Sequence, residues 1–297
     1  MPKNHPHVFP RKPVATGVGF GAVLLWALLA LLTVGSDPIP PFQLSAMTFA
    51  LGGVVGGLFS LRQGGLRLVL QTTPTAVWVL GIGGLFGYHA LYFSALRMAP
   101  AAEAGLIAYL WPLLIVLLSG MLPSETLRPL HVIGAVVSFA GAALIVAWGG
   151  AGFQWDYAAG YALAMLCALT WSGYSVLSRR FSDVPTQVVT FFCMSAAGLS
   201  ALTHFAFEQT VIPDSTVSWL SVMGLGLGPV GLAFYLWDIG VKHGDIQLLG
   251  TASYAAPLLS TCVLIVAGFA QATTVLLVAA GLITAGAGLA ALGSRKG

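Results

Sequence analysis

The charged residues of this sequence are spaced so that long apolar stretches lie between them. Nine stretches of 21 or more residues contain no Lys, Arg, Asp or Glu, namely 13–36, 38–61, 68–96, 104–124, 129–155, 157–178, 184–207, 215–237 and 246–294. A transmembrane helix needs about 20 apolar residues. Eight stretches therefore predict one helix each, and the ninth, with a break near 268–271, predicts two. We expect an all-α integral membrane protein with ten transmembrane helices.

The composition excludes a soluble fold. Hydrophobic residues make up 58% of the chain and charged residues only 7%, whereas about 25% of the residues in ordinary soluble domains are charged. A soluble protein could not cover its surface with so few charges. The partner that the composition predicts is a lipid bilayer.

The positive charges predict the orientation in the membrane, because Lys and Arg are concentrated in cytoplasmic loops. If the N-terminus is cytoplasmic, the cytoplasmic segments contain 11 of the 12 Lys and Arg residues, and only Arg97 lies outside. We therefore expect both termini in the cytoplasm, with residues 1–13 as a cytoplasmic tail. The net charge of +3 then reflects topology, and no nucleic-acid partner is expected.

An internal repeat divides the chain into two similar units. Sliding the sequence by 145 residues aligns four pairs of identical or similar residues: Trp26 with Trp171, Arg97 with Lys242, Tyr109 with Tyr254, and Pro112 with Pro257. We expect a first five-helix repeat at 14–150 and a second at 151–297, which ends in a short basic tail. Five is an odd number of crossings, so the two repeats should be inverted relative to each other.

Three prolines lie inside predicted helices and are candidate hinges. Pro112 and Pro257 occupy equivalent positions in the two repeats, and Pro229 lies in the eighth helix. A proline removes one backbone donor and bends the helix. The carbonyls four residues before Pro112 and Pro257, on Ala108 and Ser253, are then expected to lack their usual partners. An ordinary bend is the alternative for each proline taken alone.

The segment 87–96 carries a histidine and two tyrosines within a stretch that is otherwise apolar and uncharged. Tyr88, His89 and Tyr92 fall within one 100° arc of an ideal helix, so they should face the same direction. Buried polar groups in a membrane are costly and usually belong to functional cavities. The alternative is that His89 packs between helices while the tyrosines form an interfacial belt. His89 lies about 12 Å from Arg97 along the helix, which is deep for a belt residue.

Other candidate walls of a central substrate-binding cavity come from both repeats. Tyr109 and Trp111 are 200° apart on an ideal helix, so both can face one cavity only if Pro112 distorts the turn. The candidates from the second repeat are Trp171, Ser175, Ser253 and Tyr254. Ordinary packing between helices is the alternative for these residues.

The segment WPLLIVLLSGMLPSETLRPLHVIGAVVSFAGAALIV, residues 111–146, resembles the end of an EamA-type unit of the drug/metabolite transporter superfamily. The matching features are Pro112, the loop acid Glu125, the glycines Gly134 and Gly141, and the tryptophans Trp26 and Trp171 in the first helix of each unit. The resemblance covers 14–292. The second unit differs in having Gln271 near the position of the loop acid.

Within the superfamily, the aromatic cluster is most similar to the YddG-type exporters of aromatic amino acids. This resemblance implies a basket of ten helices that exports amino acids across a bacterial inner membrane. The repeat and the charge pattern by themselves imply only a transporter.

The positions of the charges also narrow the substrate class. No Lys or Arg lies near the predicted midplane, so a phosphate-bearing substrate would lack a cationic clamp. Glu103 lies at a helix start, and Asp238 is spaced i, i+4 from Lys242, which predicts an ion pair at a helix end. Aromatic walls with hydroxyl groups and one imidazole suit an aromatic or apolar amino acid.

We therefore expect a transporter that moves amino acids by alternating access, without a cofactor and driven by the substrate gradient. The alternative is an exporter of other small metabolites or drugs, with or without coupling to protons. The sequence lacks the short motifs of zinc peptidases and serine hydrolases, so neither a metal site nor an enzyme is expected. The polar residues cluster at one depth, which argues against a channel. We expect a functional monomer.

Overall fold

The computed structural model describes residues 11–63, 65–123, 125–147 and 152–295, and all regular secondary structure within these ranges is helical. Ten helical segments are long and apolar enough to cross a membrane: Lys12–Gly35, Pro41–Arg62, Thr75–Met98, Ala101–Ser119, Pro129–Val146, Trp155–Phe181, Val188–Phe207, Thr216–His243, Ile246–Val266 and Thr274–Ser294. Their number and order match the ten helices expected from the charge-free stretches.

Several spans consist of two or more helical elements. The first five spans contain α1 (Lys12–Trp26) and α2 (Leu29–Gly35); α3 (Pro41–Gln63); α5 (Thr75–Ile82), η1 (Gly83–Gly87) and α6 (Tyr88–Met98); α7 (Ala101–Ala108) and α8 (Trp111–Ser119); and α9 (Pro129–Val146). The short helix α4 (Leu66–Thr72) precedes α5.

The last five spans follow a similar plan. They contain η2 (Trp155–Tyr157), α10 (Ala158–Ser178) and η3 (Arg179–Phe181); α11 (Val188–Phe207); α12 (Thr216–Leu227), η4 (Gly228–Leu232) and α13 (Ala233–His243); α14 (Ile246–Ala252) and α15 (Ala255–Val266); and α16 (Thr274–Arg295). Both η1 and η4 are π-helical turns, whereas η2 and η3 are 3₁₀-helical.

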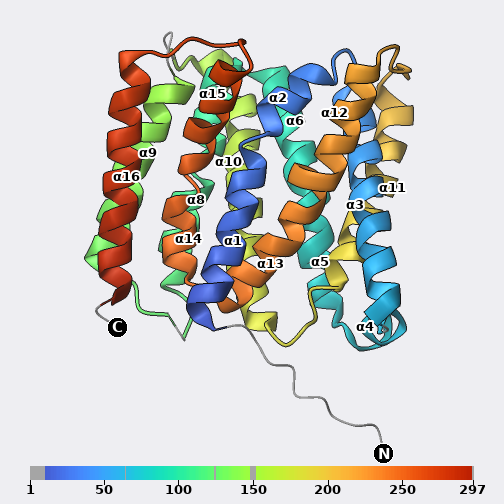
Figure 1. Ribbon diagram of the computed structural model, residues 1–297, viewed down its shortest axis with the longest axis horizontal. Helices are drawn as coiled ribbons and strands as arrows, with labels where there is room; N and C mark the ends of the chain where they lie inside the picture. Colours follow the sequence, from blue (N-terminus) through green and yellow to red (C-terminus); the bar gives the residue numbers. More distant parts are fainter. Residues whose placement is uncertain (1–10, 64, 124, 148–151, 296–297) are drawn as a thin grey trace, which may run out of the picture.

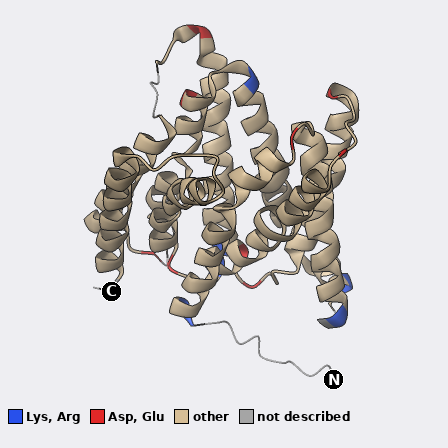
Figure 2. Cartoon of the chain, turned by 45° about the horizontal axis from the view of Figure 1, so that its top comes forward, with Lys and Arg blue, Asp and Glu red and all other residues tan. Residues whose placement is uncertain are grey.

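The spans run side by side between two ends of a bundle (Figure 1). Helix α1 begins and α16 ends at the same end, which we call the termini end; the opposite end is the far end. Figure 2 shows that most Lys, Arg, Asp and Glu residues lie towards the two ends of the bundle, and that few lie in the belt between them. This distribution suits a protein whose middle lies in hydrocarbon.

The two units repeat their irregularities as well as their helices. Adding the offset of 145 residues to η1 (83–87) gives 228–232, which are the bounds of η4. The same addition to α6 (88–98) gives 233–243, the bounds of α13. A π-helical turn is rare and is commonly found near functional sites. The third helix of each unit therefore carries the same backbone irregularity.

Prolines interrupt the spans where the sequence predicted interruptions. Pro112 lies in the first turn of α8, just after the break that follows α7. The ninth span breaks in the same way before Pro257, and Pro229 lies within η4. One detail of the expectation is wrong: the Ser253 carbonyl accepts a hydrogen bond from the backbone N–H of Ala256 at 3.0 Å. A tightened turn thus satisfies the carbonyl that Pro257 would otherwise leave unpaired.

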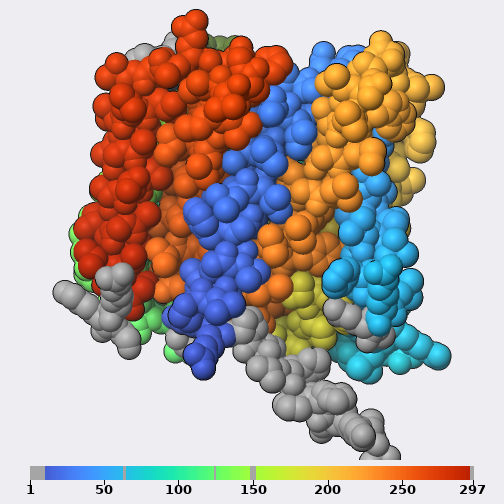
Figure 3. All heavy atoms as spheres, in the orientation of Figure 1, coloured from blue at the N-terminus to red at the C-terminus, as the bar shows by residue number. Residues whose placement is uncertain are grey.

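Reciprocal contacts join the two units. Helix α1 of the first unit packs on α13 of the second, and α10 of the second unit packs on α6 of the first. Helices α9 and α16, which end the two units, also pack together. Figure 3 shows α1 on one face of the bundle, between the helices of the eighth and ninth spans. Because each unit contributes the same elements to the contact with the other, the core lies between the units.

Small residues allow the close crossings in this core. The Cα atoms of Gly19 on α1 and Gly240 on α13 face each other so closely that a Cβ on either glycine would overlap the other backbone. On α9, Gly134 and Gly141 meet the α16 backbone in the same way. Side chains no larger than hydrogen are therefore needed where the two units approach most closely.

Ion pairs also connect the units at both ends. Glu125 in the loop after α8 pairs with Arg179 of η3, at 2.5 Å between Oε1 and Nη2. At the far end, Arg97 of α6 pairs with Glu208 after α11, at 3.2 Å. The loop acid of the first unit therefore has a structural role. Gln271, near the equivalent position of the second unit, is exposed.

Candidate substrate site at the centre of the bundle

Four tryptophans meet at the centre of the helix bundle, and we call them the tryptophan cluster: Trp26 on α1, Trp111 on α8, Trp171 on α10 and Trp237 on α13. Every pair among them has ring centroids between 5.1 and 6.3 Å apart. Such offset and edge-to-face contacts stabilise aromatic clusters beyond the burial of area. Each unit supplies two of the four rings.

Hydrogen bonds fix the orientation of two of these rings. The indole N–H of Trp26 donates to the carbonyl of Pro229 at 3.1 Å, so a ring of the first unit binds the π turn of the second. The indole N–H of Trp237 donates to the hydroxyl oxygen of Ser175 at 3.0 Å, and Ser175 is completely buried. The hydroxyl of Ser175 therefore serves to position Trp237.

The side chains that the sequence placed on one face of the third helix do lie together, next to the tryptophan cluster. The ring of Tyr88 lies 5.5 Å from that of Trp171, and Tyr88 and Tyr92 are stacked with their ring planes within 4° of parallel at 6.2 Å. His89 contacts Tyr88 edge-on at 5.2 Å. All three of these α6 side chains are only half-buried, as is Trp26, whereas Trp111, Trp171 and Trp237 are buried. They therefore place accessible polar groups beside the apolar rings of the tryptophan cluster.

The orientation of the His89 ring is set by the π turn that precedes it. Its Nδ1 lies 2.8 Å from the carbonyl oxygen of Leu85. Because a carbonyl oxygen can only accept, Nδ1 carries the proton, and Nε2 is the acceptor of the neutral ring. The rings of Phe49, Phe93 and Phe234 surround His89 at 5.1 to 6.3 Å. The imidazole is thus a single polar group set among aromatic rings.

The break in the fourth span brings Trp111 into the tryptophan cluster. Tyr109 and Leu110 form the turn between α7 and α8, and Trp111 begins the second segment. Tyr109 is half-buried, whereas Trp111 is 7% exposed. The distorted turn required by the sequence analysis is therefore present.

Two candidate residues lie elsewhere. Tyr254 is completely buried against Phe139 of α9, and its hydroxyl oxygen accepts a hydrogen bond from the backbone N–H of Leu113 at 3.0 Å. That N–H follows the break in the fourth span, where helical bonding is interrupted. Ser253 donates to the Leu249 carbonyl at 2.8 Å and is also buried. Both side chains bond to backbone groups near the helix breaks, and Tyr254 packs in a separate cluster with Ala142 and Ile283.

Several central residues are not among the site residues predicted from the sequence. Trp26 is predicted only as a repeat and family feature, and Trp237, Phe234 and Phe49 are not predicted as site residues. The repeat contained the signal, because the 145-residue offset takes His89 to Phe234 and Tyr92 to Trp237. Applying the offset to every candidate would have found both partners. Phe49 has no such signal, since its place beside His89 depends on how α3 packs.

The described residues contain no group of three or more His, Cys, Asp or Glu side chains that could hold a metal ion. What they do bring together is a ten-span bundle of two like units with polar aromatic side chains between them. This is the architecture of a membrane transporter.

The chain belongs to the EamA-like transporter family, which matches residues 15–147 and 158–292, one copy in each unit. It is 55% identical over 285 residues to the aromatic amino acid exporter YddG of Ancylobacter novellus, covering 95% of this chain and 98% of that protein. The exporter of the same name from Escherichia coli strain K12 is 23% identical over 83% of this chain and 86% of its own length.

More distant relatives include the pseudopaline exporter CntI of Pseudomonas aeruginosa, which is 27% identical over 67% of this chain and 68% of its own length. A solved crystal structure with 54% sequence identity superposes with a TM-score of 0.92 and covers 97% of this chain and 99% of that one. The fold described above is therefore the fold of known relatives. Homologues named as exporters support the export of small metabolites by a protein that is not an enzyme.

Proposed function

We propose that this protein exports aromatic and apolar amino acids through its centre by alternating access. The observation that carries the proposal is the contact between half-buried Tyr88 and Trp171. Through this contact, the accessible polar rings of the first unit adjoin the tryptophan cluster, to which both units contribute. The name of the 55% identical relative supports the same substrate class.

The chemistry of the centre suits a zwitterion with an apolar side chain. Aromatic rings of a substrate would gain about 0.5 to 1.5 kcal/mol from ring contacts with Trp111 or Trp171, beyond burial of area. The faces of Tyr88 and Tyr92 attract an ammonium group. The hydroxyls of the tyrosines, including Tyr109, can donate to a carboxylate. His89 completes this set and orients the substrate through Nε2.

We infer that Pro112, Pro229 and Pro257 act as hinges, because each lies at a helix break or π turn. Bending there would expose the substrate to each side in turn. The ring contacts and hydrogen bonds of the centre involve no carboxylate among the described residues. We therefore propose transport down the substrate's own gradient, because a carboxylate at the centre would be the usual proton carrier in coupled transport.

The membrane arrangement is part of the proposal. Both termini face the cytoplasm of a bacterial inner membrane, which puts the termini end inside. The first repeat, 14–150, and the second, 151–297, then have opposite orientations, in accordance with their reciprocal contacts. One chain contains a complete central site, so the functional unit is a monomer.

Uptake into proteoliposomes tests the proposal. The purified protein should take up labelled phenylalanine and tryptophan saturably, with lysine and a sugar phosphate as negative controls. His89→Ala, Tyr109→Ala and Trp171→Phe should each lower uptake at least tenfold without loss of the folded, monodisperse protein. Absence of aromatic uptake by intact wild-type protein would refute the substrate class. Unchanged uptake in all three variants would move the site away from the centre.

A second measurement separates gradient-driven movement from proton coupling. Internal and external substrate are set equal, and a pH gradient of one unit is then imposed across the membrane. The proposal predicts no net accumulation. Accumulation that disappears with a protonophore would favour the proton-coupled alternative for this class of exporter.

A further inference from the structure

A second polar site lies away from the aromatic centre, towards the termini end of α13. Asp238 and Lys242, one turn apart, form an ion pair with 2.9 Å between Oδ2 and Nζ. Their side chains are only 1% and 3% exposed, respectively. A buried ion pair is no better for stability than well-packed apolar side chains. Ionisable groups kept inside a membrane protein therefore indicate a function.

Each member of the pair has one further partner on the connection between α10 and α11. The Thr186 hydroxyl donates to Asp238 Oδ2 at 2.7 Å, and Lys242 donates to the Val184 carbonyl at 2.9 Å. These neutral groups can hold the two charges in place if the ion pair separates. The site therefore presents a carboxylate and an ammonium group that are separately anchored.

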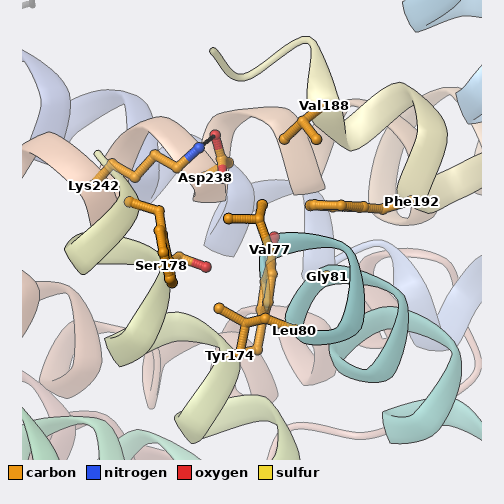
Figure 4. A pocket seen from close by; sticks show the side chains of 10 residues that line it. Val77, Leu80, Gly81, Tyr174, Ser178, Val188, Phe192, Asp238 and Lys242 are labelled. Atoms are coloured by element: carbon orange, nitrogen blue, oxygen red, sulfur yellow. Dashed lines mark ion pairs between the residues drawn. The ribbon is translucent and has the colours of Figure 1, made fainter. Parts of the chain in front are cut away.

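An apolar pocket adjoins the pair (Figure 4). Its lining comes from four spans and comprises Val77, Leu80, Gly81, Tyr174, Ser178, Phe181, Val188, Phe192, Asp238 and Lys242. The free volume is about 10 Å³, which is room for one water molecule at most. In this structure the pocket is therefore closed.

Tyr174 supplies an unused hydrogen-bonding group in this pocket. The side chain is 1% exposed, and its hydroxyl makes no well-formed hydrogen bond among the described residues, although the Ser178 hydroxyl lines the same pocket. In Figure 4 its ring extends from α10 towards the side of the pocket where Val77, Asp238 and Lys242 lie. A buried hydroxyl without a partner costs about 1 to 3 kcal/mol, so most such groups in proteins are paired. A ligand in the pocket would pair this one.

The pocket can widen because two of its walls adjoin π turns. Val77, Leu80 and Gly81 lie on α5, which leads directly into η1, and the ion pair lies on α13, which follows η4. Helices bend at π turns because the regular hydrogen bonding is interrupted there. Through η1, movement of α5 also reaches Tyr88 and His89 of the aromatic centre.

We propose that Asp238 and Lys242 form the first binding site for an amino acid zwitterion on its way to the aromatic centre, with the pair closed when the site is empty. The substrate ammonium replaces Lys242 at Asp238, and the substrate carboxylate replaces Asp238 at Lys242. The Tyr174 hydroxyl donates to that carboxylate. The apolar side chain occupies the widened space among Val77, Leu80 and Phe192. This inference rests on the proposed function.

A zwitterion is the ligand class that this site accepts at the least electrostatic cost. It exchanges one buried ion pair for two, and neither protein charge is left alone. A substrate with only an ammonium or only a carboxylate would leave Lys242 or Asp238 unpaired inside the protein, which costs several kcal/mol. The termini end is the cytoplasmic end in the proposed orientation, so an exported amino acid would meet this site first.

Transport kinetics of a neutral pair test the site. In Asp238→Leu/Lys242→Met the charges are replaced by apolar side chains, so the thermal midpoint should equal or exceed that of wild type. The KM for phenylalanine in proteoliposomes should nevertheless rise at least tenfold. Arg180→Gln/Asp183→Asn is the matched control, because it removes one base and one acid that are exposed near the same end; its KM should not change. A KM within twofold of wild type in the apolar double variant would overturn the site.

Competition by half-zwitterions tests the ligand chemistry. For wild type, 3-phenylpropionate and phenethylamine should compete at least tenfold more weakly than phenylalanine. In Asp238→Asn the advantage of phenylalanine over 3-phenylpropionate should shrink to threefold or less, and in Lys242→Met its advantage over phenethylamine should shrink likewise. If each variant weakens all three ligands equally, the pair acts without touching substrate and the proposal fails. Absence of phenylalanine transport by wild type would instead overturn the proposed function together with this site.

Discussion

The third helices of the two units share one backbone plan but carry different side chains. In both spans a π turn joins two α-helical segments, at positions exactly related by the repeat offset of 145 residues. Half-buried His89 and Tyr92 of the first unit correspond to Phe234 and Trp237 of the second, which are 4% and 0% exposed. The first unit thus presents accessible polar rings, and the second presents a closed apolar wall.

This difference shows which properties the repeat conserves. In the proposed mechanism, the breaks at π turns and prolines allow bending, which both units must perform, and this would explain why they recur. A single asymmetric substrate between two like units, however, meets different chemical groups on its two sides. Its polar end and its apolar end need different walls. The side chains of the centre have therefore diverged while the backbone has not.

The largest difference between the two units is expected at the equivalent positions Tyr92 and Trp237. Trp237→Ala should destabilise the protein by about 3 to 5 kcal/mol, because it empties a fully buried space in the tryptophan cluster. Tyr92→Ala should cost much less, since the ring is already half-exposed, but should reduce phenylalanine transport at least tenfold. Thermal unfolding in detergent and proteoliposome uptake measure the two effects. Equal loss of stability in both variants would show that Tyr92 is a packing residue like its counterpart.

The fold could be predicted from the sequence to a large extent, because each span needs only a charge-free run of about 20 residues. The prolines likewise located the breaks in the fourth, eighth and ninth spans. The π form of these turns could not be predicted: Gly83–Gly87 contains no proline to mark a break, and Pro229 predicts a bend in Gly228–Leu232 but not its π-helical hydrogen bonding. They form at tertiary contacts, such as that between the Trp26 indole and the Pro229 carbonyl.

The second test concerns the close packing around η1. A Cβ on Gly84 would overlap the ring of Tyr174, whereas a Cβ on the neighbouring Gly83 would meet nothing within 4 Å. Gly84→Ala should therefore cost about 1 to 3 kcal/mol through overpacking, and Gly83→Ala should be neutral in stability. Thermal midpoints of the two variants give the comparison directly. If Gly83→Ala is as harmful as Gly84→Ala, the π turn itself needs glycine, and the contact with Tyr174 is not the cause.

The third test makes the two units alike at His89. His89→Phe gives the first unit the side chain that the second has at Phe234, in a site already lined by Phe49 and Phe93. Stability should stay the same or rise, because an aromatic ring of similar size replaces a polar one. The KM for phenylalanine should rise about tenfold, which corresponds to about 1.4 kcal/mol of lost binding. Phe234→His is the reciprocal control, and it should not restore affinity when the two changes are combined.

The site itself could be predicted only in part. Tyr88, His89 and Tyr92 stand out in the sequence because polar aromatic residues are conspicuous in an apolar run. Tyr254 stood out for the same reason, yet its hydroxyl pairs with the backbone of Leu113. Sequence identifies a polar group inside the membrane; its partner, whether backbone or substrate, depends on the packing of other spans. Asp238 and Lys242 illustrate the same limit, since their spacing predicted the ion pair but not its burial.

The smallest effect on stability is expected at Arg97. Its side chain is exposed, whereas that of Lys242, its counterpart in the second unit, is buried. The Arg97 side chain is 53% exposed, and its partner Glu208 is 3% exposed. Arg97→Gln should therefore cost less than about 1 kcal/mol, because exposed ion pairs contribute little and are screened by salt. Glu208 also accepts hydrogen bonds from the backbone N–H groups of Phe42 and Gln43 at the start of α3.

Glu208→Gln should accordingly lower the thermal midpoint more than Arg97→Gln, since it weakens the connection of α3 to α11 as well as the ion pair. The shift caused by Arg97→Gln should disappear in 1 M salt, and the shift caused by Glu208→Gln should persist. Should Arg97→Gln prove the more damaging change, the cation rather than the buried carboxylate would hold the far end together. The exposed cation Arg97 would then contribute as much to stability as the buried cation Lys242, contrary to what their different exposure predicts.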